Sequence, residues 1–280
     1  MKFIPKEPDD SVNIPTNTHP LKIFIKVVGG ATLIVTSFYF ILGFIVNMVV
    51  PHIDHDTELS LGKLFNQSMA FNHTSEEIDS QQKILQNHLD ELISYWPEAP
   101  PFQFKISIMP SEDPNAFALP GGNILITSGM IEFLESENTM IMILGHELGH
   151  FSNRHHLKSL GRGLLFTLAG AMIFGSDNDA TTFLSGIIDV TSAQYSQSEE
   201  TQADKFGLEL LVKKYGHAGG ATQFFEKFED SKFENNSRFQ KFLSTHPTSQ
   251  KRIKLLKKLI HQKGYRIDEL VPQQLNKVPQ

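Results

Sequence analysis

The stretch IMILGHELGHFS, residues 141–152, indicates both the fold and the chemistry of this chain. Its apolar residues recur at helical spacing, and Ser136 stands where a helix N-cap is expected, so the stretch predicts a helix. Positions four apart share one helix face, so His146 and His150 can bind one metal ion, and Glu147 beside them can take a proton from a water molecule. Because zinc suits neutral imidazoles, the stretch predicts a zinc hydrolase, in the first instance a peptidase.

A third metal ligand is needed, and two residues compete for the role. His156 follows the second histidine at the six-residue spacing of metzincin proteases, although Asn153 stands where that pattern has glycine. Glu200 opens another helical pattern and shares a face with Asp204, four residues later. Small residues on that face would let a second helix approach, so that Glu200 binds zinc while Asp204 accepts the second N–H of a ligating histidine. The alternative for this pair is an acidic, solvated first turn. We favour Glu200 over His156.

Three separated motifs resemble those of one group of zinc proteases. Residues 115–122 (NAFALPGG) are similar to an N-A-F-A-x-P-G-G segment, residues 146–150 to H-E-x-x-H, and residues 200–204 (ETQAD) to E-x-x-A-D. Their order and separation resemble those of the membrane-associated gluzincins. This group includes the HtpX heat-shock proteases, the BepA-like proteases, the CaaX prenyl proteases and the mitochondrial inner-membrane stress protease. The resemblance is closest to the BepA-like branch.

The resemblance implies a role for each matching residue. One zinc ion per chain would be bound by His146, His150 and Glu200, with Glu147 as the general base and Asp204 orienting a ligating histidine. It also implies a mostly helical zincin-type peptidase domain with protein or peptide substrates. A role in quality control of envelope or membrane proteins is expected from the resemblance alone.

The residues before the metal motif predict a small antiparallel sheet. Residues 104–108 alternate between apolar and polar side chains, and residues 124–127 form a second strand after a Pro-Gly-Gly turn. One interpretation is a structural hairpin. The resemblance adds that this sheet edge lies beside the metal and holds an extended peptide by strand addition. The candidate residues for this role are Asn115, Ala116, Phe117 and Ala118.

His246, followed by a proline, resembles the H-P element found toward the end of the BepA-like proteins. Three interpretations remain open. His246 could donate a hydrogen bond to the developing oxyanion, or it could bind the open position of the zinc and act as an off switch. In the third interpretation it is a loop histidine before a helix that begins with proline.

Residues 27–50 contain no charged side chain and are rich in isoleucine, valine, phenylalanine and leucine. At 1.5 Å per residue this run is about 36 Å long, which is enough to cross a bilayer. A cleaved signal peptide is the alternative, but the run is long and no A-x-A-like site follows it. Four lysines precede the run, and one basic residue lies in the twenty residues after it. We therefore predict a single-pass anchor with a cytoplasmic N-terminus and an extracytoplasmic domain, which is periplasmic if the source is bacterial.

The composition excludes several classes of function. The chain has 280 residues, a net charge of −6 and no cysteine. The acidic balance gives no support for a nucleic-acid partner, and the absence of cysteine excludes disulfides and a thiol nucleophile. The apolar run 164–174 is too short to span a bilayer, so we expect a buried helix, with an element dipping into the membrane as the alternative.

These patterns combine into an α+β chain, mostly helical, with a small antiparallel sheet and one transmembrane helix in front. The expected parts are a disordered cytoplasmic tail (1–22), an anchor in the lipid bilayer (23–50), a connector (51–75) with a capping box at Thr74, a zinc metallopeptidase domain (76–270) and a C-terminal tail (271–280). The expected function is a membrane-anchored zinc endopeptidase of unspecified oligomeric state. The alternatives are a membrane-tethered zinc-containing chaperone with little proteolysis, and a metzincin that uses His156.

Overall fold

The computed structural model describes residues 19–68, 76–174, 195–229, 242, 244–247 and 250–275. It divides into two compact units, residues 1–45 and 46–280. The first unit contains most of helix α1 (Pro20–Val49), and the second contains every other element.

Helix α1 covers the apolar run that the sequence predicts to be a membrane anchor. It begins at Pro20, three residues before the expected start of the anchor, because proline is favoured in the first turn of a helix. Its large apolar side chains are mostly exposed, as in Ile34 and Phe44. Together with the short 3-10 helix η2 (Val50–His52) it is, within the described ranges, the one helix long and apolar enough to cross a membrane. Its length and composition agree with the predicted membrane anchor.

The expected connector is largely helical. Helix α2 (His55–Ser68) occupies most of it, and helix α3 (Glu76–Ser94) follows. The capping box expected at Thr74 lies outside the described residues. Buried leucines at positions 85, 89 and 92 give α3 one apolar face, which packs against the sheet.

The sheet has three strands, β1 (Lys105–Met109), β2 (Ala116–Leu119) and β3 (Asn123–Thr127). Strand β3 lies in the centre, antiparallel to β2 but parallel to β1. The sheet is therefore mixed, and the expectation of a purely antiparallel sheet was wrong for β1. The chain passes over the end of the sheet after β1, forms β2 on the far side and returns through Gly121 and Gly122, whose positive φ angles suit a tight turn.

Among the described residues, four of the helices that follow the sheet surround the motifs. They are α4 (Ser128–Phe133), α5 (Glu137–Ser152), α6 (His155–Phe174) and α8 (Gln197–Tyr215). The Ser136 side chain accepts from the Thr139 amide and caps α5, as predicted. Ser196 and Glu199 form a capping box on α8, which ends at left-handed Gly216. Helices α9 (Gln223–Glu229) and α12 (Gln250–Gln262) complete the described elements.

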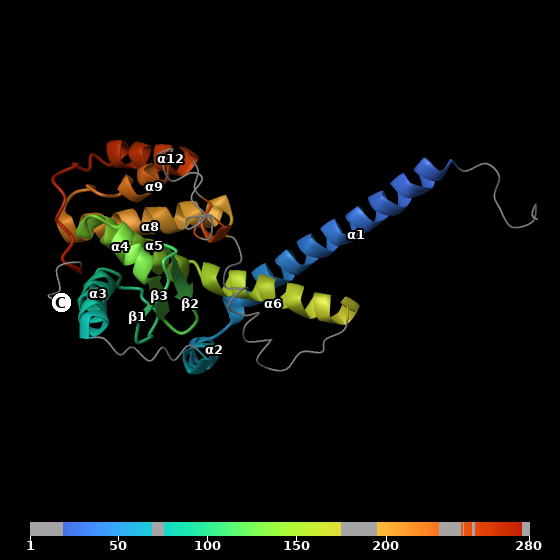
Figure 1. Ribbon diagram of the computed structural model, residues 1–280, viewed down its shortest axis with the longest axis horizontal. Coiled ribbons are helices and arrows are strands. Elements are labelled where there is room, and N and C mark those ends of the chain that lie inside the picture. Colours follow the sequence, from blue (N-terminus) through green and yellow to red (C-terminus); the bar gives the residue numbers. More distant parts are fainter. Residues whose placement is uncertain are drawn as a thin grey trace, which may run out of the picture. The chain divides into compact units, whose positions relative to one another are not determined.

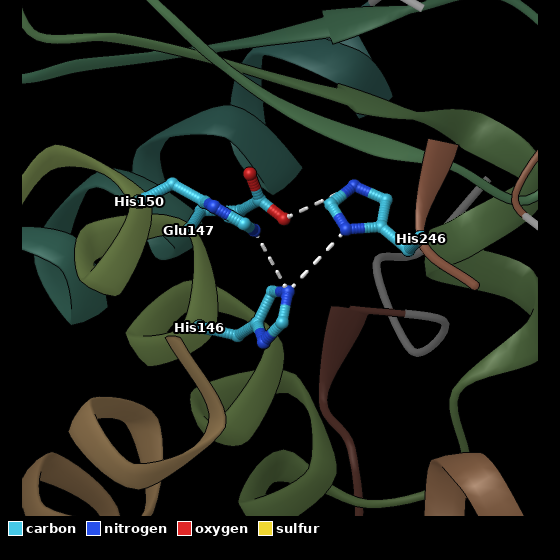
Figure 2. A group of neighbouring side chains, drawn as sticks. All are labelled: His146, Glu147, His150 and His246. Atoms are coloured by element: carbon cyan, nitrogen blue, oxygen red, sulfur yellow. Dashed lines mark hydrogen bonds and ion pairs between the residues drawn. The ribbon is translucent and has the colours of Figure 1, made fainter. Parts of the chain in front are cut away.

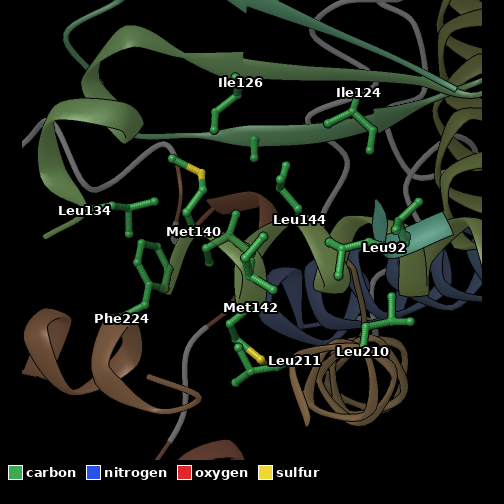
Figure 3. Packing of buried hydrophobic residues seen from close by; sticks show 14 of the residues in the cluster. Leu92, Ile124, Ile126, Leu134, Met140, Met142, Leu144, Leu210, Leu211 and Phe224 are labelled. Carbon is green, nitrogen blue, oxygen red and sulfur yellow. The ribbon is translucent and has the colours of Figure 1, made fainter. Parts of the chain in front are cut away.

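Helix α5 is the centre of the domain. It lies between the sheet and α8 (Figures 1 and 3), and all its residues from Asn138 to Phe151 are buried. A Cβ atom at Gly145 would lie 2.9 Å from the Cα of Gly207, and one at Gly149 would lie 2.7 Å from the Cα of Ala203. Because glycine stands at both contacts, α5 and α8 approach nearly backbone to backbone. This approach brings the two sequence motifs together.

The apolar core extends over both faces of α5. Figure 3 shows side chains of β3 on one side and of α8 on the other. The residues concerned include Ile124 and Ile126 of β3, Met140 and Leu144 of α5, and Leu210 and Leu211 of α8. Burial of each such side chain contributes about 1.5–3 kcal/mol. The H-E-x-x-H motif is thus on a helix whose residues from Asn138 to Phe151 are all buried.

Candidate metal centre

His146 and His150 point toward one another from successive turns of α5, with their Nε2 atoms 3.1 Å apart (Figure 2). Glu200 reaches them from the first turn of α8. Its Oε2 lies 3.7 Å from His146 Nε2, and its Oε1 lies 3.4 Å from His150 Nε2. All three side chains are buried. The structure therefore brings together the two histidines and the glutamate that the sequence singled out.

The donor set fits a zinc ion. Tetrahedral zinc with ligand bonds of about 2.0–2.1 Å separates its ligand atoms by about 3.3 Å, which is close to the distances in this group. His146 Nδ1 lies 2.9 Å from Asp204 Oδ1 and carries its proton there, so its Nε2 presents a lone pair. That lone pair faces the Nε2 of His150 at 3.1 Å. A cation between the nitrogens and the carboxylate would turn this repulsion into coordination.

Asp204 is positioned by an arginine that lies far along the chain. Arg252 Nε lies 2.7 Å from Asp204 Oδ2, and Arg252 Nη2 lies 2.7 Å from Oδ1. Burial alone would raise the pKa of Asp204, but the guanidinium holds that pKa below its ordinary value. Arg252 Nη1 also lies 2.5 Å from Glu200 Oε2. Both carboxylates are therefore ionised beside the histidines.

Glu147 belongs to the same cluster. One of its carboxylate oxygens lies within 4.8 Å of a ring nitrogen of His146, of His150 and of His246. Its side chain is fully buried, and this burial raises the pKa of its carboxyl group. A hydrogen bond from the backbone of Ala118 in β2 acts in the opposite direction. Its Oε2 has no hydrogen-bond partner among the described residues. An unpaired, buried carboxylate oxygen of raised basicity is suited to receive a proton from a bound molecule.

His246 reaches the cluster from the segment before α12. Its Nδ1 lies 3.4 Å from His146 Nε2, and its Nε2 lies 3.9 Å from Glu147 Oε1 (Figure 2). The same Nδ1 lies 3.1 Å from Glu200 Oε1. The ring stacks on Phe242 at 5.0 Å. His246 Nδ1 thus lies as close to the ligand atoms of His146 and Glu200 as these lie to one another, which suits a further ligand to the same ion.

The structure does not place His156 in the cluster. Its Nε2 lies 2.8 Å from Glu58 Oε1 in α2, and its Nδ1 lies 3.2 Å from the backbone oxygen of His150. Both ring nitrogens are therefore engaged away from the metal position. This corrects the metzincin alternative, which needs His156 as the third ligand. The position of His156 follows from the turn before α6, where Arg154 adopts a positive φ of 55° and changes the direction of the chain.

The expected substrate-strand residues lie at the edge of the sheet. Ala116, Phe117 and Ala118 belong to β2, which pairs only with β3 within the described part of the chain. Asn115 precedes the strand, and its amide donates to Thr127 Oγ1 at 2.8 Å. Along the other edge of β2 the described residues supply side chains rather than a strand: the Ala116 amide donates to Asn115 Oδ1 at 2.9 Å, and the Ala118 backbone bonds Glu147.

Sequence reasoning missed two aromatic neighbours of the cluster. Tyr195 stacks on the ring of His150 with centroids 3.8 Å apart and an interplanar angle of 18°. His155 Nδ1 lies 3.2 Å from His150 Nδ1. His155 follows His150 by five residues across a helix break, which is not a recognised spacing for metal ligands. Tyr195 belongs to no sequence motif that would have pointed to it.

A buried helix with two histidines and a glutamate, joined by a carboxylate from a neighbouring helix, defines a site of the zinc-peptidase class. Comparison with known proteins narrows the class. Residues 79–260 match the model of Peptidase family M48. The chain belongs to this family.

Several characterised proteins are similar to the chain. The mitochondrial metalloendopeptidase OMA1 of Saccharomyces cerevisiae is 28% identical over 155 residues, which cover 53% of this chain and 44% of that protein. The β-barrel assembly-enhancing protease of Escherichia coli K12 is 26% identical over 164 residues, or 55% of this chain and 33% of that protein. The OMA1 metalloendopeptidase of Bos taurus is 24% identical over 192 residues, or 64% and 37%. The chain thus matches less than half the length of these relatives.

Proposed function

We propose that this protein is a membrane-anchored zinc-dependent endopeptidase. The observation that carries the proposal is the convergence of His146, His150 and Glu200 from two helices onto one buried point, with the Glu147 carboxylate beside it. Family membership supports the reaction class, and α1 supports attachment to a membrane.

In this proposal each side chain of the site has a separate role. His146 Nε2, His150 Nε2 and one Glu200 oxygen would hold a single zinc ion, which when bound would polarise the scissile carbonyl and lower the pKa of a water molecule. Glu147 receives a proton at its unpaired Oε2 and delivers it to the leaving amine. Asp204 keeps the Nδ1 proton on His146, so that the lone pair of Nε2 faces the metal.

The edge of β2 that faces away from β3 is proposed to hold the substrate. An extended peptide would add to this edge as a further strand, using the backbone of the segment formed by Asn115, Ala116, Phe117 and Ala118. Because the Ala118 backbone also bonds Glu147, a peptide bound there would pass directly beside the general base. Selection by backbone rather than by side chain would suit unfolded proteins, and so a role in quality control.

His246 is proposed to act as a switch ligand. Its Nδ1 occupies the fourth position around the metal point, where a reacting water or carbonyl would have to enter. The competing role, donation to the oxyanion, requires the ring to withdraw from that position first. The distances therefore favour the switch interpretation.

The domain boundaries and the topology remain part of the proposal. Residues 76–270 are assigned as the peptidase domain, residues 23–50 as the bilayer anchor and residues 51–75 as the connector, with tails at 1–22 and 271–280. The N-terminus is assigned to the cytoplasm and the peptidase domain to the opposite side, because lysines precede α1 and are scarce after it.

The central test compares Glu147→Gln with the unaltered chain in detergent or lipid. We expect one zinc per chain by elemental analysis in both, and loss of cleavage of an unfolded reporter protein by about 100-fold or more in the variant. Glu137→Gln, at the start of the same helix and bonded to Tyr215, is the matched control and should keep activity. A cellular phenotype that is unchanged in Glu147→Gln would support the chaperone alternative, and the absence of zinc from the unaltered chain would refute the proposal.

A further inference from the structure

We infer that His155 is a positioning residue that accepts the Nδ1 proton of His150 and so directs the Nε2 lone pair of His150 toward the metal. The inference rests on the proposed function, since it takes His150 as a zinc ligand. What it adds is the group that fixes the tautomer and the orientation of the His150 ring.

The local fold brings the two rings together. Helix α5 ends at Ser152, Arg154 turns the chain with a φ of 55°, and His155 begins α6. The turn folds His155 back beside His150, with ring centroids 5.3 Å apart and Nδ1 atoms 3.2 Å apart. Both side chains are buried, so water does not compete for this contact.

The proton positions follow from the geometry. A hydrogen bond between two Nδ1 atoms needs one proton and one lone pair. His150 presents Nε2 to His146 and Glu200 at the metal point, so in its neutral form its proton must be on Nδ1. His155 therefore accepts at Nδ1 and carries its own proton on Nε2.

Helix α8 provides the partners for that second proton. The Gln202 side chain hydrogen-bonds His155, and Glu199 lies close enough to act on it electrostatically. The Gln202 amide nitrogen donates to Ser198 Oγ at 3.3 Å, which leaves its oxygen to accept from His155. Arg162 holds the Glu199 carboxylate through two contacts of 3.3 and 3.4 Å. His155 thus connects the metal helix to the same helix that supplies Glu200.

The two metal histidines are therefore held in different ways. His146 donates to an ionised carboxylate, Asp204, whereas His150 donates to a neutral imidazole. Tyr195 stacks on the His150 ring and limits its rotation. Because an imidazole acceptor has one lone pair in the ring plane, it orients His150 more narrowly than a carboxylate would.

The test uses three substitutions that differ in where they place an acceptor. Asparagine puts Oδ1 where the imidazole Nδ1 stood, glutamine puts its oxygen near the Nε2 position, and leucine has no acceptor. Zinc affinity is measured on the full-length protein by competition with a chromogenic chelator. Cobalt(II) substitution gives a ligand-field spectrum as a second readout that is independent of catalysis.

We expect His155→Leu and His155→Gln to raise the dissociation constant for zinc by about 10–100-fold and to shift the cobalt spectrum. We expect His155→Asn to stay within about threefold of the unaltered protein, because it restores the acceptor. Equal losses in His155→Asn and His155→Gln would overturn the inference, as would wild-type affinity in His155→Leu. If His155→Leu does not fold, the comparison of asparagine with glutamine decides. Lack of zinc in the unaltered protein would instead refute the proposed function.

Discussion

Arg252 donates two hydrogen bonds of 2.7 Å to Asp204, one to each carboxylate oxygen, in the interior of the domain. The same Asp204 oxygen that accepts from Arg252 Nη2 lies 2.9 Å from His146 Nδ1. A planar guanidinium on α12 thus sets, through Asp204, the orientation of His146 on α5, one of the proposed metal ligands. Helix α12, which follows His246 in the chain, is therefore coupled through Arg252 and Asp204 to the cluster of His146, His150 and Glu200.

Arg252→Lys should weaken metal binding without removing the positive charge. A lysine ammonium cannot reproduce the two parallel hydrogen bonds, so Asp204 would be free to rotate away from His146. We expect the dissociation constant for zinc to rise by about 10–100-fold, measured by chelator competition. Arg252→Met should in addition lower the free energy of unfolding by about 3–5 kcal/mol, because Asp204 and Glu200 would lose their buried counter-charge. Unchanged zinc affinity in Arg252→Lys would contradict the coupling.

Gly149→Ala should destabilise the domain, although alanine is normally the better helix residue by about 1 kcal/mol. The new methyl group would lie 2.7 Å from the Cα of Ala203, and backbone cannot yield as a flexible side chain does. Helices α5 and α8 would have to separate, which costs about 1–3 kcal/mol and moves Glu200 away from the histidines. Denaturant unfolding monitored by circular dichroism measures the change. Lys205→Ala, at an exposed position on α8, is the control. A higher free energy of unfolding in Gly149→Ala would show that α5 and α8 are not in close backbone contact at Gly149 and Ala203.

The helix contact also explains how far the sequence could predict the site. The pairing of Glu200 with the histidines could be predicted from the sequence, because small residues on the same face as Glu200 and Asp204 permit a close helix neighbour and the motif resemblance favoured one. The parallel pairing of β1 with β3 was not, because strand direction depends on the path of the chain between the strands. The neighbours Tyr195 and His155 were likewise hidden, since their partners lie across a helix break or on another segment.

Glu58 should stabilise the domain in a pH-dependent way. Its oxygens contact His156 Nε2 at 2.8 Å and Arg154 Nη2 at 3.3 Å, and Arg154 also donates to the Val50 backbone at 2.9 Å. Burial alone would raise the pKa of Glu58, but the hydrogen bond from His156 and the charges of His156 and Arg154 lower it below 4.5. A carboxylate with a lowered pKa stabilises the fold above its unfolded value of about 4.5 and loses this effect as the pH falls through the folded value.

Glu58→Gln should therefore reduce the free energy of unfolding by about 1–3 kcal/mol near neutral pH. The difference from the unaltered protein should shrink as the pH is lowered below about 4.5. Denaturant titrations of both proteins at several pH values measure this. Asp56→Asn, an exposed acid on the same helix, is the control. A difference that is constant down to acid pH would show that the Glu58 charge does not contribute.

The predicted topology can be tested because the chain contains no cysteine. Lys205→Cys places a single thiol on the exposed face of α8, and Ser11→Cys places one before α1. In intact cells or oriented vesicles, a membrane-impermeant maleimide should label position 205 from the extracytoplasmic side and position 11 only after permeabilisation. The reverse pattern would invert the proposed orientation. Labelling of both positions without permeabilisation would indicate that α1 does not span the membrane.

His246→Ala should increase proteolysis of an unfolded reporter. The side chain holds the fourth position at the metal point, 3.1 Å from Glu200 and 3.4 Å from His146, and its removal opens that position to water and substrate. Zinc content should stay at one per chain, because three ligands suffice for a catalytic zinc site. A fall in turnover with unchanged KM would instead identify His246 as a donor to the transition state, since an interaction made only there lowers kcat alone. His261→Ala, on the exposed end of α12, should leave activity unchanged and controls for the loss of a histidine in this region.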